Sequence, residues 1–107
     1  NMIEIYGIKN CSTCRKAFKS IQKEISFYDL KKDNLPKSLL KQFYNKYGLK
    51  LLNKKSLTWR NLSEKEKKLE VLTLLSNYPL LLKRPLIINK NELFIGWDIE
   101  TEESLKK

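Results

Sequence analysis

Two cysteines three positions apart are the residues of this chain best suited to chemistry. They bound the motif Cys11-Ser12-Thr13-Cys14, and the sequence of 107 residues contains no other cysteine. Apolar residues recur at helical spacing from Cys14 to Ile21, which places the motif at the start of a helix. Unpaired backbone N–H groups and the helix macrodipole stabilise negative charge at such a start. The pattern therefore predicts that Cys11 has a lowered pKa and acts as a nucleophile.

Two interpretations of Cys14 stay open. Its thiol follows Cys11 by one helical turn, where it can attack a mixed disulfide formed on Cys11. It also fits the apolar stripe of the predicted helix, and buried cysteines are common in protein cores. Arg15 adds positive charge beside the pair, so we count it among the candidate substrate-binding residues. The motif as a whole predicts a small thiol-redox protein.

The sequence contains no histidine, which removes several other chemistries. Cys–His nucleophile pairs, Ser–His triads and His-rich metal sites are all excluded. A single cysteine pair lacks the four ligands of a structural zinc site, so we expect no metal. Activation of a thiol then depends on backbone dipoles or on Arg and Lys side chains.

The dipeptide Arg84-Pro85 is a second candidate feature, and it precedes a predicted strand. Proline at this point is compatible with a plain strand start. A cis peptide bond would instead direct Arg84 toward the site. Arginine offers a planar, permanently charged group for oxyanions, carboxylates or a thiolate. We therefore include Arg84 as a candidate catalytic residue and Pro85 as a candidate substrate-binding residue.

The elements that position these residues follow from the hydrophobic pattern. Alternating or β-branched runs predict strands at residues 2–6, 25–29, 86–88 and 92–95. Helical spacing predicts helices over residues 14–21, 34–48 and 63–78, with a short helix after residue 96. The order predicts an α/β sandwich with a four-stranded mixed sheet, in which a β-α-β unit has a right-handed crossover.

Local signals predict where the helices begin and end. For the second helix, we expect Asn34 as the cap, Pro36 in the first turn and Gly48 at the end. Ser63 and the Glu three residues later form a capping box, so a third helix starts there. That helix should turn its leucines inward and stop before Pro79, and these leucines are Leu69, Leu72 and Leu75. Thr101 is the candidate cap of the last helix.

The net charge of +10 is concentrated in the middle of the chain. Residues 31–68 hold twelve Lys and Arg against only three acidic residues. Such a segment favours an anionic partner, although we interpret most of these lysines as a solvated face. Nucleic-acid binding ranks low, because the aromatic residues of this segment share the apolar stripe of the predicted second helix. These aromatic residues are Phe43, Tyr44 and Tyr47.

The composition also bounds the setting of the protein. The hydrophobic fraction of 41% is enough for one core, and no apolar run reaches the length of a membrane span. The opening residues are too few and too polar for a signal peptide, so we expect a cytoplasmic protein. A reducing compartment makes a structural disulfide between the cysteines improbable.

Several motifs together resemble the ArsC/Spx family, a branch of the thioredoxin-like superfamily. The similarity is greatest to its arsenate reductase-like proteins of the YffB type. The motifs fall in family order over nearly the whole chain. They are residues 6–17 (YGIKNCSTCRKA), 51–53 (LLN), 58–62 (TWRNL), 83–87 (KRPLI) and 94–97 (FIGW).

The resemblance implies a single thioredoxin-like domain over residues 1–107. A helical insertion, about residues 33–80, would lie between the β-α-β unit and the C-terminal β-hairpin and helix. Cys11 matches the family's nucleophile, and Arg84 matches an arginine that precedes a cis-proline beside the thiol. The resemblance also implies glutathione as co-substrate, a glutaredoxin-type thiol donor and no tightly bound cofactor. We further expect a monomer that takes a small anionic substrate.

The resemblance also bears on the substrate. Arsenate reductases of the family hold the oxyanion with three arginines, of which this chain keeps Arg84. Asn53 and Gly96 stand at the other two positions, and Lys54 follows as a point charge. Charge-assisted hydrogen bonds contribute roughly 1.5–3 kcal/mol each, so we expect weak arsenate binding. Asn53 and Lys54 are accordingly candidate substrate-binding residues for another ligand.

A regulatory function is the alternative that the resemblance implies. Spx proteins bind the C-terminal domain of the RNA polymerase alpha subunit and use their cysteine pair as a disulfide switch. Cys11 and Cys14 could serve in the same way, and Gly48 lies near a glycine that Spx uses in this contact. Gly48 is equally explained as a helix end.

Overall fold

The structure is a computed structural model, and it describes residues 2–106. The chain divides into two compact units. The first unit comprises both ends of the chain, residues 2–33 and 84–106, and the second is Asn34–Lys83. The second unit covers the segment predicted as a helical insertion, about residues 33–80. The predicted domain bounds at residues 1 and 107 lie outside the described residues.

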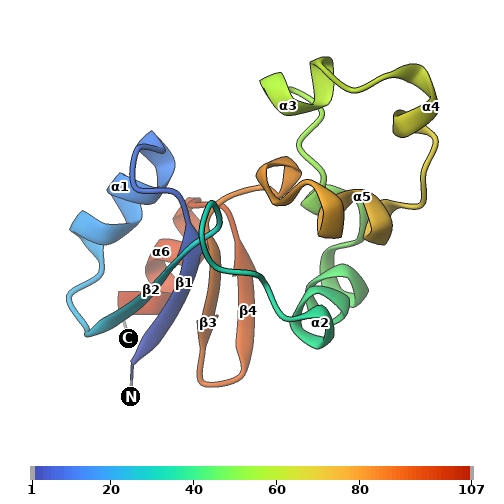
Figure 1. Cartoon of the computed structure of the whole chain (residues 1–107). Helices are drawn as coiled ribbons and strands as arrows, with labels where there is room; N and C mark the ends of the chain where they lie inside the picture. Colours follow the sequence, from blue (N-terminus) through green and yellow to red (C-terminus); the bar gives the residue numbers. More distant parts are fainter. Residues whose placement is uncertain (1, 107) are drawn as a thin grey trace. The chain divides into compact units, whose positions relative to one another are not determined.

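A four-stranded mixed sheet forms the centre of the first unit (Figure 1). Its strands are β1 (Ile3–Gly7), β2 (Ile25–Asp29), β3 (Leu86–Asn89) and β4 (Glu92–Ile95). In the order β2-β1-β3-β4, β1 pairs in parallel with β2 and antiparallel with β3, and β3 pairs antiparallel with β4. The four-stranded mixed sheet expected from the sequence is therefore confirmed.

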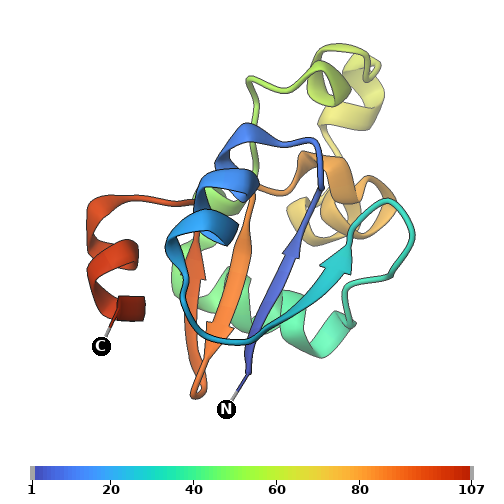
Figure 2. The same cartoon turned by 90° about the vertical axis from the view of Figure 1, so that its left-hand side faces the viewer.

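Two helices cover one face of this sheet, α1 (Ser12–Ser20) and α6 (Ile99–Lys106), as Figures 1 and 2 show. A parallel pair of strands requires a crossover, and α1 provides it between β1 and β2. Because side chains alternate along a strand, Ile3 and Ile5 both face the helices. The core of the unit is a cluster of six buried residues, Ile3, Ile5, Ala17, Ile21, Ile87 and Leu105.

The β3–β4 hairpin closes through a two-residue loop. Asn89 pairs with Glu92, so only Lys90 and Asn91 lie between the strands. Both have positive φ, 51° for Lys90 and 69° for Asn91, as a type I′ turn requires. The strand predicted at residues 86–88 is therefore one residue longer in the structure, because Asn89 belongs to β3.

The cap predicted for α6 was wrong. Asp98, not Thr101, caps the helix, because its Oδ1 accepts a hydrogen bond of 2.8 Å from the backbone N–H of Thr101. A carboxylate at this position also interacts favourably with the helix dipole. Thr101 lies in the first turn of the helix and is 5% exposed, so it packs as a core residue.

The second unit consists of short helices and turns. Its α-helices are α2 (Lys37–Tyr47), α3 (Leu57–Arg60), α4 (Glu64–Lys67) and α5 (Val71–Asn77). Two 3-10 turns, η1 (Gly48–Leu51) and η2 (Pro79–Leu81), join them to the flanking segments. Helices α2 and α5 pack together, and the unit's buried side chains include Phe43, Leu74 and Leu75.

The predicted end of α2 is correct, but its predicted cap is wrong. Gly48 ends the helix as expected, with a φ of 58° that favours glycine. Asn34 does not cap it, because Pro36 occupies the cap position and its carbonyl accepts from the N–H of Leu40. Proline is suited to this place since it has no N–H to leave unpaired.

The single helix predicted over residues 63–78 is in fact two helices, α4 and α5. The chain tightens after the first turn, where the N–H of Lys68 donates to Lys65 and that of Leu69 to Glu66. These three-residue steps end α4 before the helix can continue. Leu69 falls in the break and is 41% exposed, whereas Leu75 is buried as predicted.

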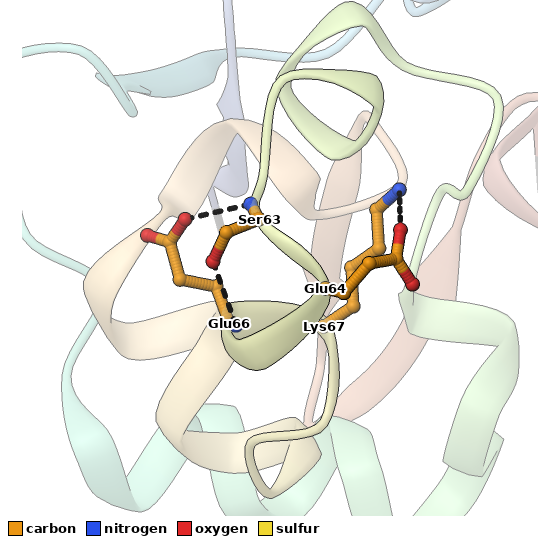
Figure 3. Close-up of polar contacts among 4 residues, drawn as sticks. All are labelled: Ser63, Glu64, Glu66 and Lys67. Carbon is orange, nitrogen blue, oxygen red and sulfur yellow. Dashed lines mark hydrogen bonds and ion pairs between the residues drawn. The ribbon is translucent and has the colours of Figure 1, made fainter.

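The predicted capping box at α4 is confirmed (Figure 3). Ser63 Oγ accepts from the N–H of Glu66 at 3.0 Å, and Glu66 Oε1 accepts from the N–H of Ser63 at 2.8 Å. Lys67 Nζ also lies 3.6 Å from Glu64 Oε1. The second carboxylate oxygen of Glu66 accepts from the hydroxyl of Tyr78, which ties α4 to the residue after α5.

No helix within residues 2–106 combines the length and apolar character needed to span a membrane.

Candidate active site

Cys11 occupies the N-cap position of α1, at the point where the chain turns from the β1 loop into the helix. Its backbone is extended, with φ −80° and ψ 125°. The carbonyl of Cys11 accepts from the N–H of Arg15 at 3.0 Å, and its own N–H donates to Ile8 at 3.1 Å. The backbone of Cys11 is thus held on both sides, and its half-buried side chain lies beside the first turn of the helix.

The surroundings of the Cys11 sulfur favour its anionic form. Burial alone raises the pKa, but the backbone N–H groups of Cys14 and Thr13 lower it, followed by the Cys14 thiol and Arg84. The lowering contributions prevail, so the pKa of Cys11 is below the ordinary value of 9.0 for a cysteine. The helix start expected from the sequence is therefore the group that stabilises the thiolate most.

Cys14 has the opposite character. It is fully buried in the first turn of α1, and burial is the largest cause that raises its pKa to about 11. The N–H of Ile8 and Arg84 act in the other direction, while the charge of Cys11 adds to the rise. Cys14 is therefore a neutral thiol at neutral pH and donates a hydrogen bond to the Cys11 sulfur. Cys14 is thus a buried core residue and also contacts the sulfur of Cys11, so the two interpretations of this residue do not exclude each other.

Both cysteines are free thiols in this structure. No group of three or more His, Cys, Asp or Glu side chains with metal-binding geometry occurs among residues 2–106. The two cysteines can support the chemistry of a thiolate beside a neutral thiol.

Gly7 is a site residue that the sequence reasoning missed. It lies just beyond the strand predicted at residues 2–6, but it is the last residue of β1. A Cβ added at this position would lie 2.7 Å from Cys14 Sγ, closer than real Cβ atoms come to other atoms. The only signal in the sequence was a glycine at the end of a strand, which often marks a close approach of another group.

The structure brings Arg84 to the thiols. Its side chain is half-buried and hydrogen-bonds the sulfur of Cys11. The peptide bond between Arg84 and Pro85 is cis. Pro85 is buried, and its carbonyl accepts from the N–H of Gly96 at 2.8 Å. Arg84 and the cysteine pair thus form one cluster within the first unit.

Arg15 lies in α1, directly after Cys14, and reaches back to the loop that precedes the motif. Its Nη2 donates to the carbonyl of Asn10 at 3.3 Å, on the exposed surface. The side chain therefore stabilises the approach to the helix start. Its predicted part in substrate binding stays a prediction.

Asn53 and Lys54 belong to the second unit. Asn53 Oδ1 accepts from the N–H of Lys55 at 3.0 Å, and its backbone N–H donates to Leu81 at 2.8 Å. Asn53 therefore organises its own turn. Lys54 Nζ lies 5.5 Å from the ring centroid of Trp59, within the range of a cation–π contact. The predicted part of Asn53 and Lys54 in substrate binding stays a prediction.

Comparison with known proteins decides which family carries this arrangement. The model of the ArsC family matches residues 6–105. The chain belongs to the ArsC family. A protein of uncharacterised function from Haemophilus influenzae is 39% identical over 105 residues, covering 91% of this chain and 92% of that protein. The resemblance found in the sequence motifs is thereby confirmed.

Solved structures of related proteins agree on the fold. A protein named YFFB superposes with a TM-score of 0.88 at 24% identity, covering 96% of this chain and 97% of its own. An arsenate reductase (ArsC) related protein from Brucella melitensis gives a TM-score of 0.69 at 29% identity, covering 100% and 96%. The thioredoxin-like fold predicted from the sequence is confirmed. Membership of the ArsC family supports a thiol-dependent redox role.

Proposed function

We propose that this ArsC-family protein is a thiol reductase in which Cys11 is the nucleophile. Glutathione or a glutaredoxin-type protein would supply the reducing equivalents, and no tightly bound cofactor takes part. The observation that carries the proposal is the set of groups on the Cys11 sulfur: two backbone N–H groups, the Cys14 thiol and Arg84. Together they keep a half-buried sulfur anionic, and the thiolate is the reactive form of cysteine.

The reaction on a disulfide substrate R–S–S–R′ has two steps. The Cys11 thiolate attacks one sulfur, forms a Cys11–S–S–R bond and releases R′S⁻ with the electron pair of the broken bond. Cys14 then loses its proton to solvent and attacks Cys11 Sγ, which forms the Cys11–Cys14 disulfide and releases RS⁻. The substrate gains two electrons and the cysteine pair loses two. Two equivalents of an external thiol restore the pair, a supply that fits the cytoplasm.

The pKa of Cys14 supports this order of events. While Cys11 is anionic, its charge and its hydrogen bond hold the proton on Cys14. A covalent adduct on Cys11 removes that charge, so neither the charge nor the hydrogen bond then raises the pKa of Cys14. Ile8 and Arg84 continue to lower the pKa of Cys14. Burial, the largest cause of the raised pKa, persists in the adduct, but Cys14 loses its proton more readily there than beside the Cys11 thiolate.

Arg84 supports a small anionic substrate. Its guanidinium already lies at the Cys11 sulfur, where it can bind a carboxylate or oxyanion of the substrate. In the proposed site, Pro85 borders Arg84, and Arg15 contributes a further positive charge from α1. Asn53 cannot replace a charged, bidentate partner, so we propose that arsenate is a poor substrate.

A turnover assay tests this function. The protein is incubated with glutathione and glutaredoxin, in one series with a glutathione mixed disulfide and in another with arsenate. We expect reduction of the disulfide to exceed that of arsenate, and Cys11→Ser to abolish it. Equal turnover by the wild type and Cys11→Ser would show that this thiol is not the catalyst.

The same thiol pair also favours a second candidate function, a redox switch of the Spx type. The adjacent free thiols can form a disulfide, and the Asn34–Lys83 unit holds eleven Lys and Arg against three acidic residues. In this alternative, the protein binds the C-terminal domain of the RNA polymerase alpha subunit according to the state of Cys11 and Cys14. Absence of binding in a pull-down with both the reduced and the oxidised protein would eliminate it.

A further inference from the structure

We infer that Gly7 is a positioning residue for the resolution step, because its missing Cβ leaves the space in which Cys14 Sγ lies. The inference rests on the thiol function proposed above. The last residue of β1 would then help to position a reacting sulfur, in addition to its place in the sheet. Gly7 acts through the sulfur of Cys14.

Of the three atoms nearest to a Cβ added at residue 7, only Cys14 Sγ would be too close. A Cβ on residue 7 would lie 2.7 Å from Cys14 Sγ, but 3.6 Å from Phe27 Cε1 and 3.7 Å from Cys14 Cβ. The last two distances are ordinary van der Waals contacts. An alanine at this position would therefore displace the sulfur of Cys14 and little else.

The sulfur has few other places to go. Cys14 is fully buried, and within a helix its side chain has only two readily accessible χ1 rotamers. In its present position, Cys14 Sγ accepts from the N–H of Ile8 and hydrogen-bonds the sulfur of Cys11. Gly7 and Ile8 are consecutive, so the end of β1 both leaves space for the sulfur and holds it. Displacement of the sulfur would disrupt its alignment with Cys11.

The step affected is the second one of the reaction. In a Cys11–S–S–R adduct, the Cys14 thiolate attacks Cys11 Sγ, the Cys11–Cys14 bond forms and RS⁻ leaves with the electron pair. The proton of Cys14 passes to solvent. An external thiol resolves the adduct without Cys14, so a Gly7→Ala protein retains the slower monothiol route.

The two steps can be observed separately with dithiobis-nitrobenzoate, an aromatic disulfide that releases a coloured thiolate. Attack by Cys11 releases the first equivalent, and attack by Cys14 on the adduct releases the second. For Gly7→Ala we expect the second release to be slowed about tenfold or more. This is the effect of losing one charge-assisted contact, here the one from the N–H of Ile8 to the Cys14 thiolate. The first release persists at a rate set by the pKa of Cys11. Absence of a fast first release in the wild type would refute the proposed function rather than this inference.

A double variant makes the test specific. In a Cys14→Ala background the clashing sulfur is gone, so adding Gly7→Ala should leave the pH profile of the first release unchanged. A wild-type rate of second release in Gly7→Ala would overturn the inference. So would an equal upward shift of the Cys11 pH profile by Gly7→Ala in both backgrounds, since that indicates general distortion of β1.

Folding of the variants gives a further outcome. If Gly7→Ala fails to fold but Gly7→Ala/Cys14→Ala folds, crowding against Cys14 Sγ is established directly. If neither folds, the glycine is required by the strand itself and the inference is wrong. Thermal unfolding followed by circular dichroism distinguishes these cases.

Discussion

The buried thiol of Cys14 donates a hydrogen bond to the sulfur of Cys11, and the pKa values of the two residues move in opposite directions. One helical turn separates them, yet one lies at the unpaired N–H groups of the helix start and the other inside the core. The same motif therefore provides a nucleophile that is anionic and a second thiol that stays protonated. This division is what stepwise disulfide chemistry requires.

Replacing Cys14 with alanine should raise the pKa of Cys11, because the sulfur loses a hydrogen-bond donor. The rate of alkylation of Cys11 by iodoacetamide against pH measures this pKa. Cys14→Ser is the matched control, since its hydroxyl is also a donor, and it should give a smaller shift. An unchanged profile in Cys14→Ala would mean that the Cys14 thiol does not stabilise the Cys11 thiolate.

Replacing Arg84 with alanine should also raise the pKa of Cys11, because its guanidinium hydrogen-bonds that sulfur. Arg84→Lys keeps the charge but loses the planar donor geometry, so an intermediate shift is expected. Arg15→Ala is the control: this side chain lies on the exposed carbonyl of Asn10. If Arg15→Ala shifts the profile as much as Arg84→Ala, the effect is one of net charge alone.

The raised pKa of Cys14 makes stability depend on alkaline pH. Its folded-state pKa of about 11 exceeds the ordinary value of 9.0, so the folded protein holds the proton more tightly than the unfolded chain. The resulting stabilisation is complete below pH 9 and is lost as pH rises through 11. Urea unfolding of the wild type and Cys14→Ala at pH 8 and near pH 11 measures the difference. The wild type should lose more stability than the variant over this range, and parallel losses would contradict the shift.

Replacing Ser63 with alanine should destabilise the Asn34–Lys83 unit by about 1 kcal/mol, a usual effect of losing a helix cap. The substitution leaves the N–H of Glu66 without the acceptor shown in Figure 3. The free energy of unfolding in urea provides the measurement. Ser76→Ala, at an exposed position inside α5, is the control and should have little effect. Equal losses in both variants would show that the capping box does not stabilise the unit.

The first unit could be predicted from the sequence because its local patterns agree with its packing. Ile3 and Ile5 alternate as a half-buried strand should, and Lys90-Asn91 forms the tight turn that residues tolerant of positive φ permit. Cys11 could be placed at a helix start because Cys14 and Ile21 fixed the phase of the helix. These features depend on near neighbours in the chain.

The wrong predictions concern helix ends, where a neighbouring residue or a local turn overrode the signal used for the prediction. Asn34 and Thr101 are good caps by residue type, but Pro36 and Asp98 occupy the cap positions. Leu69 fitted a longer helical stripe, yet the tightening after Lys65 ended α4 before it. Hydrophobic spacing does not record such a break.

Gly7 was missed for a different reason. Its importance lies in the distance from its missing Cβ to Cys14 Sγ, and that distance depends on how α1 crosses β1. A sequence pattern records residue types but not a tertiary approach of this kind. The placement of Arg84 at Cys11 is equally tertiary, and it was expected from a family resemblance rather than from local pattern.

The pH dependence of Cys11 alkylation in the wild-type protein tests the activated thiolate most directly. The protein is reacted with iodoacetamide over a range of pH, and the modified residue is identified by peptide mass spectrometry. We expect Cys11 to react first, with a midpoint clearly below the ordinary cysteine value of 9.0. A midpoint at or above that value would show that the helix start, Cys14 and Arg84 do not activate the thiol.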